Sequence, residues 1–284
     1  MAIIQFVFSI VILSIIYLKM IKRETPRIGK AQATVPVILG IVSLVVSVVL
    51  VILLAIGLSK LGFNKDNISN LALRSIISSF FSAGLPEEIG KGLFIVLCIN
   101  IFKPKNVYEY LLTGFGVGMG FTLFEEFLYE TNLLALVIRV FVITFHSLLG
   151  SIMASYIGMA KYYKLNKTEN KNITMMYVKA LLIPIIIHTI YDATNVKNAG
   201  LEASVPDNVQ EIAVLIALFT VLLAFILQII IHMKIKKVTE KLIEMKIEVY
   251  KRLLFIIQNF QGRSVSLLLI CKKLMYQLVH FQHF

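Results

Sequence analysis

Long hydrophobic runs separated by short polar stretches make up most of the chain. Seven of these runs are long enough to cross a bilayer as a helix, which needs roughly 20 apolar residues. They lie at about 2–18, 35–58, 72–102, 108–129, 132–160, 175–195 and 211–233. The pattern predicts an all-α fold, a polytopic bundle of about seven transmembrane helices over residues 1–233.

The composition agrees with a membrane protein. Hydrophobic residues make up 58% of the 284 residues and charged residues 15%, whereas about 25% of the residues in a soluble domain are charged. The mean hydropathy is +0.85. The net charge of +12 would also suit a nucleic-acid-binding protein, so the positions of the basic residues have to decide between the two classes.

Basic residues gather in alternate connections between the hydrophobic runs. One set follows the first, third, fifth and seventh runs: Lys19, Lys22, Arg23, Arg27, Lys30, Lys103, Lys105, Lys161, Lys164, Lys167, Lys171 and the basic residues of 234–252. The other connections contain Lys60, Lys65 and Lys197. Because the basic side of a membrane protein faces the cytoplasm, we expect a multi-pass cell-membrane protein with its N-terminus outside and its C-terminus in the cytoplasm. Membrane lipids are then expected partners, and nucleic acid is not.

The residues after the last run predict a separate cytoplasmic segment. Hydrophobic residues recur there every three or four positions, at Ile235, Val238, Leu242, Met245 and Val249. This spacing is typical of an amphipathic helix, which would lie on the inner leaflet or against a partner, and a solvated extension fits equally well. We therefore expect a basic amphipathic extension over 234–284. Cys98 and Cys271 predict neither a disulfide nor a metal pair.

Three charged residues interrupt the third run. Each ionised side chain at the centre of a membrane helix costs about 2.5–3.5 kcal/mol, yet Glu87, Glu88 and Lys91 lie together there. On a helix, Lys91 is four and three residues after the two carboxylates and can reach both. A charge cluster can simply join helices, but carboxylates in a dry site are also a common source of a catalytic base.

The fourth run contains closely spaced glycines and a second acidic pair. Gly116 and Gly120 have the spacing that allows close helix packing in membranes. Glu125 and Tyr129 are four residues apart and share a helix face, whereas Glu126 points about 100° away from Glu125. We expect Glu126 at the membrane interface.

The fifth and sixth runs contribute two histidines. His146 lies inside the fifth run, where Arg139 is a possible counter-ion for Glu125 or Glu126. In the sixth run, His188 and Asp192 are four residues apart, so the carboxylate can orient the imidazole. Four hydrophobic runs thus each place polar side chains at similar depth. The sequence predicts that these side chains line one polar cavity inside the membrane.

These residues form an ordered set of motifs that resembles the PrsW family. The motifs are E-E-x-x-K at Glu87, Glu88 and Lys91, F-E-x-x-x-Y at 124–129, His146 followed by Gly150, and H-x-x-x-D at His188 and Asp192; they span residues 82–195. The family is similar to the type II CAAX prenyl endopeptidases and to bacterial immunity-type membrane proteases. Those relatives usually have E-E-x-x-x-R and a final H-x-x-x-N, so the lysine and Asp192 favour the PrsW branch.

The resemblance implies an intramembrane endopeptidase with its core over 72–195. Its substrates would be single-span membrane proteins, such as an anti-sigma factor cut first on the extracytoplasmic side. Peptide hydrolysis needs a base for water, a donor for the oxyanion and an acid for the leaving amine. We expect Glu87 to be the base, with Glu88 and Lys91 setting its charge and position. His146 and His188, the latter held by Asp192, would act on the oxyanion or leaving group, and Glu125 and Tyr129 would support them.

Two alternatives remain at this stage. Two histidines and a carboxylate form an accepted zinc site, here His146, His188 and Glu87. We favour metal-free glutamate catalysis without a cofactor, because H-E-x-x-H is absent and Lys91 is a poor neighbour for a cation. In a different class, a non-catalytic scaffold or a proton-coupled transporter would also need buried Glu, His and Lys.

Overall fold

The computed structural model of the chain describes residues 2–22, 28–128, 142–165, 172–194, 212–230 and 233. Within these residues every regular element is a helix, which confirms the predicted all-α fold. The chain divides into two compact units, Met1–His232 and Met233–Phe284, and the helices named below belong to the first. The predicted amphipathic extension over 234–284 lies outside the described residues.

The helices match the predicted hydrophobic runs closely. They are α1 (Ala2–Lys22), α2 (Lys30–Lys60), α3 (Leu71–Ser79), the π-helix η2 (Phe80–Gly84), α4 (Leu85–Phe102), α5 (Val107–Leu128), α7 (Phe145–Leu165) and α8 (Ile173–Ala193). A single 3-10 turn, η1 (Lys65–Asn67), lies between α2 and α3, and a further helix covers Ile212–Ile230. Because α3, η2 and α4 follow one another directly, they together account for the predicted run 72–102. The first part of the run 132–160 lies outside the described residues.

Length and apolar composition separate these helices into two groups. Four of the described helices are long and apolar enough to cross a membrane: Ile3–Lys22, Lys30–Lys60, Ile173–Ala193 and Ile212–Ile230. The helices α5 and α7 are of similar length but contain more glycine and polar residues. Nearly every described side chain of α5, and those of the first half of α7, are buried by other parts of the protein. Such helices do not need an apolar surface toward lipid.

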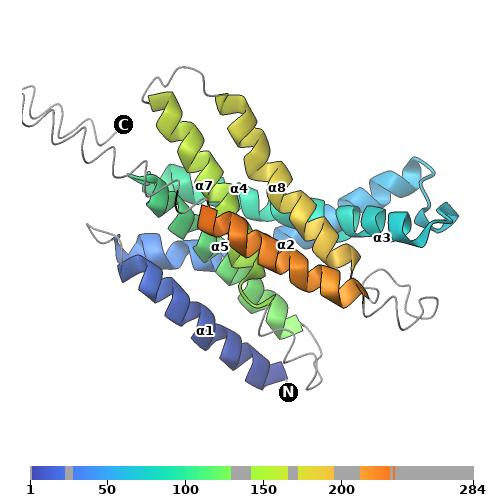
Figure 1. Cartoon of the computed structure of the whole chain (residues 1–284), viewed down its shortest axis with the longest axis horizontal. Coiled ribbons are helices and arrows are strands. Elements are labelled where there is room, and N and C mark those ends of the chain that lie inside the picture. The colour runs from blue at the N-terminus through green and yellow to red at the C-terminus, as the bar shows by residue number, and fades with distance from the viewer. Residues whose placement is uncertain are drawn as a thin grey trace, which may run out of the picture. The chain divides into compact units, whose positions relative to one another are not determined.

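The helix α5 lies at the centre of the helical unit. It contacts α1, α2, α4 and α7, while α8 packs on α7, α3 and η2, and Figure 1 shows α7 and α8 running side by side. Glycines allow α5 to approach its neighbours closely. A methyl group on Gly114 would lie 2.1 Å from the carbonyl oxygen of Gly150 in α7, and one on Gly120 would lie 1.8 Å from that of Val37 in α2. These contacts confirm the predicted packing role of the glycines.

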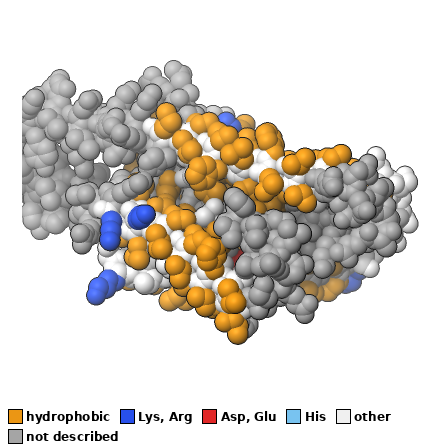
Figure 2. All heavy atoms as spheres, turned by 60° about the horizontal axis from the view of Figure 1, so that its bottom comes forward, with side chains coloured by type: hydrophobic (Ala, Val, Ile, Leu, Met, Phe, Trp, Pro, Cys, Tyr) orange, Lys and Arg blue, Asp and Glu red, His pale blue; other side chains and the backbone are white. Residues whose placement is uncertain are grey.

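The outer surface is suited to lipid. Large hydrophobic side chains of α1, α2, α8 and Ile212–Ile230 are exposed along most of each helix, and Figure 2 shows such side chains covering much of the described surface on one face. Monomeric soluble proteins rarely expose a contiguous apolar area of this extent to water. The structure therefore agrees with the membrane setting expected from the composition.

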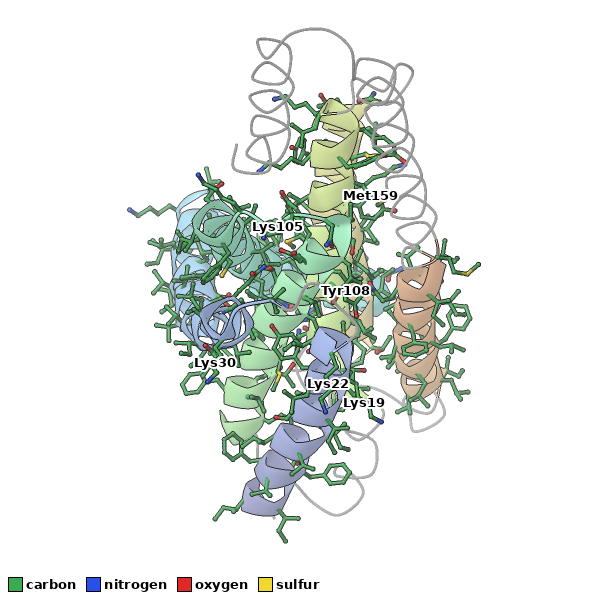
Figure 3. The ribbon with its side chains drawn as sticks, turned by 90° about the vertical axis from the view of Figure 1, so that its left-hand side faces the viewer. Lys19, Lys22, Lys30, Lys105, Tyr108 and Met159 are labelled. Carbon is green, nitrogen blue, oxygen red and sulfur yellow. The ribbon has the colours of Figure 1, made fainter. Side chains whose placement is uncertain are left out.

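Lysines from two separate connections lie near one another. Figure 3 labels Lys19 and Lys22 at the end of α1, Lys30 at the start of α2 and Lys105 between α4 and α5. Hydrogen bonds join these elements: the Tyr108 hydroxyl donates to the carbonyl oxygen of Met20 at 3.0 Å, and Gln32 donates to Glu109 at 2.9 Å. Basic connections that the charge pattern assigned to one side of the membrane thus meet in space.

Candidate active site

The two adjacent glutamates lie in the first turn of α4, directly after the π-helix η2. Ser75, Ser79, Gly84 and Glu88 are all buried, and the step from Ser79 to Gly84 is one residue longer than the other two. The wide turn of a π-helix accommodates this extra residue, so Glu88 lies on the same helix face as Ser75, Ser79 and Gly84. That face packs on α8, because a methyl group on Gly84 would lie 2.1 Å from the Thr189 hydroxyl oxygen.

His188 in α8 is surrounded by carboxylates. Its Nδ1 lies 2.7 Å from Oε1 of Glu88, and its Nε2 lies 3.3 Å from Oδ2 of Asp192 and 3.7 Å from Oε2 of Glu87. Asp192 therefore shares a helix face with the imidazole, as its spacing predicted. Carboxylates only accept hydrogen bonds when ionised, so His188 is the donor to Glu88 and Asp192; the 3.7 Å to Glu87 is an ion-pair distance and not a hydrogen bond.

His146 lies in the first turn of α7, and both of its ring nitrogens have partners. Its Nε2 lies 2.7 Å from Oε2 of Glu125 in α5, and its Nδ1 lies 3.0 Å from Nζ of Lys91. A lysine ammonium can donate but not accept, so Nδ1 accepts and the ring proton is on Nε2, facing Glu125. The backbone here is fixed as well, because a methyl group on Gly118 would lie 2.2 Å from the carbonyl oxygen of His146.

Lys91 connects the two histidines through Glu88. Its ammonium group lies 2.5 Å from Oε1 of Glu88, and both side chains are 0% exposed. The same oxygen accepts a hydrogen bond from His188, so Oε1 of Glu88 accepts from both Lys91 and His188. The sequence predicted that Lys91 would reach both glutamates of α4; its described ion pair is with Glu88, and its other hydrogen bond is to His146.

Aromatic rings form the apolar wall of this cluster. The ammonium of Lys91 lies 4.4 Å from the ring centroid of Phe121, and Phe121 lies 4.9 Å from the His146 ring. Phe145 packs on both imidazoles, at 5.7 Å from His146 and 5.8 Å from His188. These rings exclude water from the buried charges. Sequence reasoning missed both phenylalanines because apolar residues in hydrophobic helices give no distinguishing signal.

Two carboxylate oxygens in the cluster have no hydrogen-bond partner among the described residues. They are Oε2 of Glu87 and Oε2 of Glu88, and both atoms are buried. The side chain of Glu87 as a whole is 20% exposed, whereas that of Glu88 is not exposed. Glu87 is therefore the glutamate of this pair that a bound molecule can reach.

Glu87, His146 and His188 each direct one donor atom into a common space, and these atoms lie within 4.8 Å of one another. One bridging water can join atoms about 4.6 Å apart through two hydrogen bonds of about 2.8 Å. A carboxylate and two imidazoles are also zinc ligands. The three side chains are of the types that bind water or zinc, and Oε2 of Glu87 has no hydrogen-bond partner among the described residues. This space therefore suits either a water molecule or a zinc ion.

The remaining predicted residues have different outcomes. Glu125 contacts His146, whereas Tyr129 and Arg139 lie outside the described residues. Glu126, which was expected at the membrane interface, is buried against other parts of the protein and is only 4% exposed. Its Oε2 accepts a hydrogen bond from Gln5 of α1. The packing of α1 on α5 supplies the polar partner, and sequence spacing contains no information about such a contact.

Comparisons with known proteins agree with the motif pattern. A family model described as PrsW family intramembrane metalloprotease matches residues 32–233. The chain is 31% identical over 134 residues to Protease PrsW of Oceanobacillus iheyensis, covering 46% of this chain and 56% of that protein. It is 28% identical over 134 residues to Protease PrsW of Bacillus subtilis strain 168, covering 45% and 57%.

The chain thus spans little more than half the length of these curated relatives. No solved structure matches the chain.

Proposed function

Because the chain belongs to the PrsW family of intramembrane metalloproteases, we propose that it hydrolyses peptide bonds of membrane-anchored proteins inside the bilayer. The observation that supports this proposal is the convergence of Glu87, His146 and His188, whose donor atoms lie within 4.8 Å of one another. Three helices, α4, α7 and α8, bring a carboxylate base and two imidazoles to one place, and peptide hydrolysis needs a base and hydrogen-bond donors of this kind.

Glu87 is the proposed general base. Its buried Oε2 has no hydrogen-bond partner among the described side chains, so it can accept a proton from a bound water molecule. The resulting hydroxide attacks the carbonyl carbon of the peptide bond, and the proton held by Glu87 passes to the leaving amine. Glu88 is less suited to this role, because its Oε1 is already shared by Lys91 and His188; it positions His188 instead.

The histidines are the proposed donors to the developing oxyanion. In the structure both N–H groups of His188 face carboxylates, Glu88 at 2.7 Å and Asp192 at 3.3 Å. The oxyanion would replace the longer contact, so that Nε2–H turns from Asp192 to the substrate while Glu88 holds the ring through Nδ1. A fixed donor of this kind contributes about 10²- to 10³-fold to the rate of acyl transfer. Glu125 and Lys91 fix the orientation of His146 in the same way.

A zinc-dependent form of the reaction is the second candidate, supported by the donor set and by the description of the family as metalloproteases. Glu87, His146 and His188 would hold the ion, which when bound would polarise the peptide carbonyl and make water more acidic. In the structure both nitrogens of His146 are already hydrogen-bonded, to Lys91 and Glu125. We therefore place metal-free catalysis by Glu87 first.

Cleavage by the purified full chain tests the proposal. The protein in detergent is incubated with a panel of single-span membrane proteins that includes anti-sigma factors, the proposed substrate class. Cleavage that is lost in Glu87→Gln, with unchanged thermal unfolding, supports the enzyme. Stable partner binding without cleavage would support a scaffold instead, and proton-coupled uptake in vesicles would support a transporter.

A membrane-permeable chelator separates the two forms of the reaction. Unchanged cleavage in its presence is expected for glutamate catalysis. Inhibition that added zinc reverses would establish the metal-dependent form and assign Glu87 as a ligand rather than the base.

A further inference from the structure

A second cavity lies away from the candidate active site, between α2 and the helix that contains η2. Its volume is about 280 Å³, and its lining comes from α2, η1, α3 and η2. Phe81 and Ser82 of η2 face it, whereas Gly84, at the end of the same π-helix, contacts α8. The cavity and the catalytic cluster are therefore on different faces of this helical segment.

The cavity lies where α2 reaches the membrane boundary. The helix has 31 residues, which at 1.5 Å per residue is about 46 Å, whereas the hydrocarbon layer is about 30 Å thick. The lining residues of α2 extend from Val51 to Ser59, over about 12 Å of helix, and α2 ends at Lys60. With α2 centred in the bilayer, we expect one end of the cavity to face the headgroups and the other to face the hydrocarbon.

The lining combines polar and apolar side chains. The end of α2 and the loop after it contribute Ser59, Asn64 and Lys65 together with Leu58 and Phe63, the earlier part of α2 contributes Val51 and Ala55, and the segment of α3 and η2 contributes Ile77, Ser78, Phe81 and Ser82. Among the residues whose side chains the structure describes, Lys65 is the one charged side chain in the lining. The ammonium of Lys65 lies 3.5 Å from the Ser78 hydroxyl.

We propose that this cavity binds one anionic phospholipid. The phosphate lies against Lys65, Asn64 and Ser78, and an acyl chain follows the apolar side of α2 past Ala55 toward Phe81. A phospholipid has both kinds of group that such a lining suits: an anionic, hydrogen-bond-accepting head and an apolar tail. A peptide segment of a substrate fits less well, because the cavity is not on the α8-facing side that contains Glu88 and His188.

Lipid retention by the purified full chain tests this site without reference to catalysis. Phosphatidylglycerol and phosphatidylcholine with identical acyl chains are added in equal amounts, and bound lipid is measured by native mass spectrometry. The wild type should retain phosphatidylglycerol preferentially. Lys65→Gln should lower that preference by about 5-fold, the effect expected for one lysine near an anionic surface.

Two matched controls make the result specific. Lys60→Gln removes the same charge from the same end of α2 but lies outside the cavity lining, so it should leave the preference unchanged. Ala55→Phe fills the apolar part and should lower retention of both lipids, whereas Leu53→Phe, at a position 59% exposed to the surroundings, should not. Thermal unfolding of each variant checks that it is folded.

Several results would overturn the proposal. Equal effects of Lys65→Gln and Lys60→Gln would indicate diffuse electrostatic attraction, and equal retention of the two lipids by the wild type would indicate that no headgroup is recognised. If Ala55→Phe blocked cross-linking of a single-span protein while lipid retention stayed unchanged, the cavity would be a peptide site.

Discussion

At the scale of single residues, Glu88 holds the two histidines together through one oxygen atom. Its Oε1 accepts from Lys91 at 2.5 Å and from His188 at 2.7 Å, and Lys91 also donates to His146 at 3.0 Å. Because the carboxylate and the ammonium are fully buried, each depends on the other for compensation of its charge. The buried pair is therefore a structural requirement of the site as well as a positioning device.

Lys91→Met should destabilise the protein strongly. It leaves the buried Glu88 carboxylate without its cation, and breaking such a pair costs about 3–5 kcal/mol. Glu88→Gln added to Lys91→Met should recover a large part of that loss, because the double variant contains no uncompensated charge from the pair. Thermal unfolding in detergent measures both effects, with Lys60→Met as an exposed control. A single variant as stable as the wild type would show that Glu88 obtains its compensation elsewhere.

Two substitutions distinguish the roles of His188 and Asp192. His188→Ala should lower kcat by about 10²- to 10³-fold, because it removes a donor to the oxyanion. Asp192→Asn should retain most of the activity, since an amide oxygen still accepts from Nε2 and Glu88 still holds Nδ1 at 2.7 Å. Cleavage of a single-span substrate gives both rates. Normal cleavage by His188→Ala would assign the histidine a packing role and leave His146 as the donor.

For single residues, the sequence predicted which side chains belong to the site better than it predicted which of them contact one another. Spacing within one helix correctly indicated that His188 faces Asp192 and that Lys91 reaches Glu88. The bond from Lys91 to His146 joins residues 55 positions apart, and helix periodicity contains no information about which helices meet. The same limit explains why Glu126 was placed at the interface although Gln5 holds it inside the protein.

At the scale of helices, the contact of α5 with α7 determines where His146 lies. Gly118 and Gly114 bring the two backbones together at His146 and Gly150, so the imidazole is attached to a rigid helix pair rather than to a loop. Motif spacing indicated close packing by glycine, but it could not show which glycine faces the histidine. The four glycines of α5 alternate along the chain and therefore point in several directions around the helix.

Gly118→Ala should reduce activity by moving His146. A methyl group there would lie 2.2 Å from a backbone oxygen of His146, so α7 must shift, and misplacement of a catalytic group by 1 Å can cost about 10²-fold. Gly92→Ala is the matched control, because its methyl group would meet only the flexible Met153 side chain at 3.2 Å. Comparison of kcat and KM for the two variants checks this; equal small effects would show that α7 adapts without moving the imidazole.

At the scale of the whole molecule, the distribution of lysines predicts the orientation in the membrane. Lysines at the end of α1, the start of α2 and the α4–α5 connection meet near one end of the helices (Figure 3), and few basic residues lie in the other connections. By the positive-inside rule, we expect the first end to face the cytoplasm. The cavity that contains Lys65 would then open to the extracytoplasmic leaflet.

Cysteine labelling on intact cells measures this orientation. With Cys98 and Cys271 replaced, Lys65→Cys should react with a membrane-impermeant maleimide, and Lys105→Cys should react only after the cells are permeabilised. Both side chains are exposed, and the charge pattern predicts that they lie on opposite sides of the membrane, so access to the reagent reports the side on which each one lies. The reverse pattern would invert the topology and move the Lys65 cavity to the inner leaflet.

The buried ion network also has a consequence for how the protein is made. His188 is synthesised 100 residues after Glu88, which takes about 5–20 s at typical ribosomal rates. During that interval α4 contains three ionisable side chains, and each of them, when ionised at the centre of the membrane, would cost about 2.5–3.5 kcal/mol. The ion pair of Glu88 with Lys91 can already form, but the contacts with α7 and α8 cannot. The nascent α4 must therefore stay in the insertion machinery, or against α2, until the ribosome has delivered its later partners.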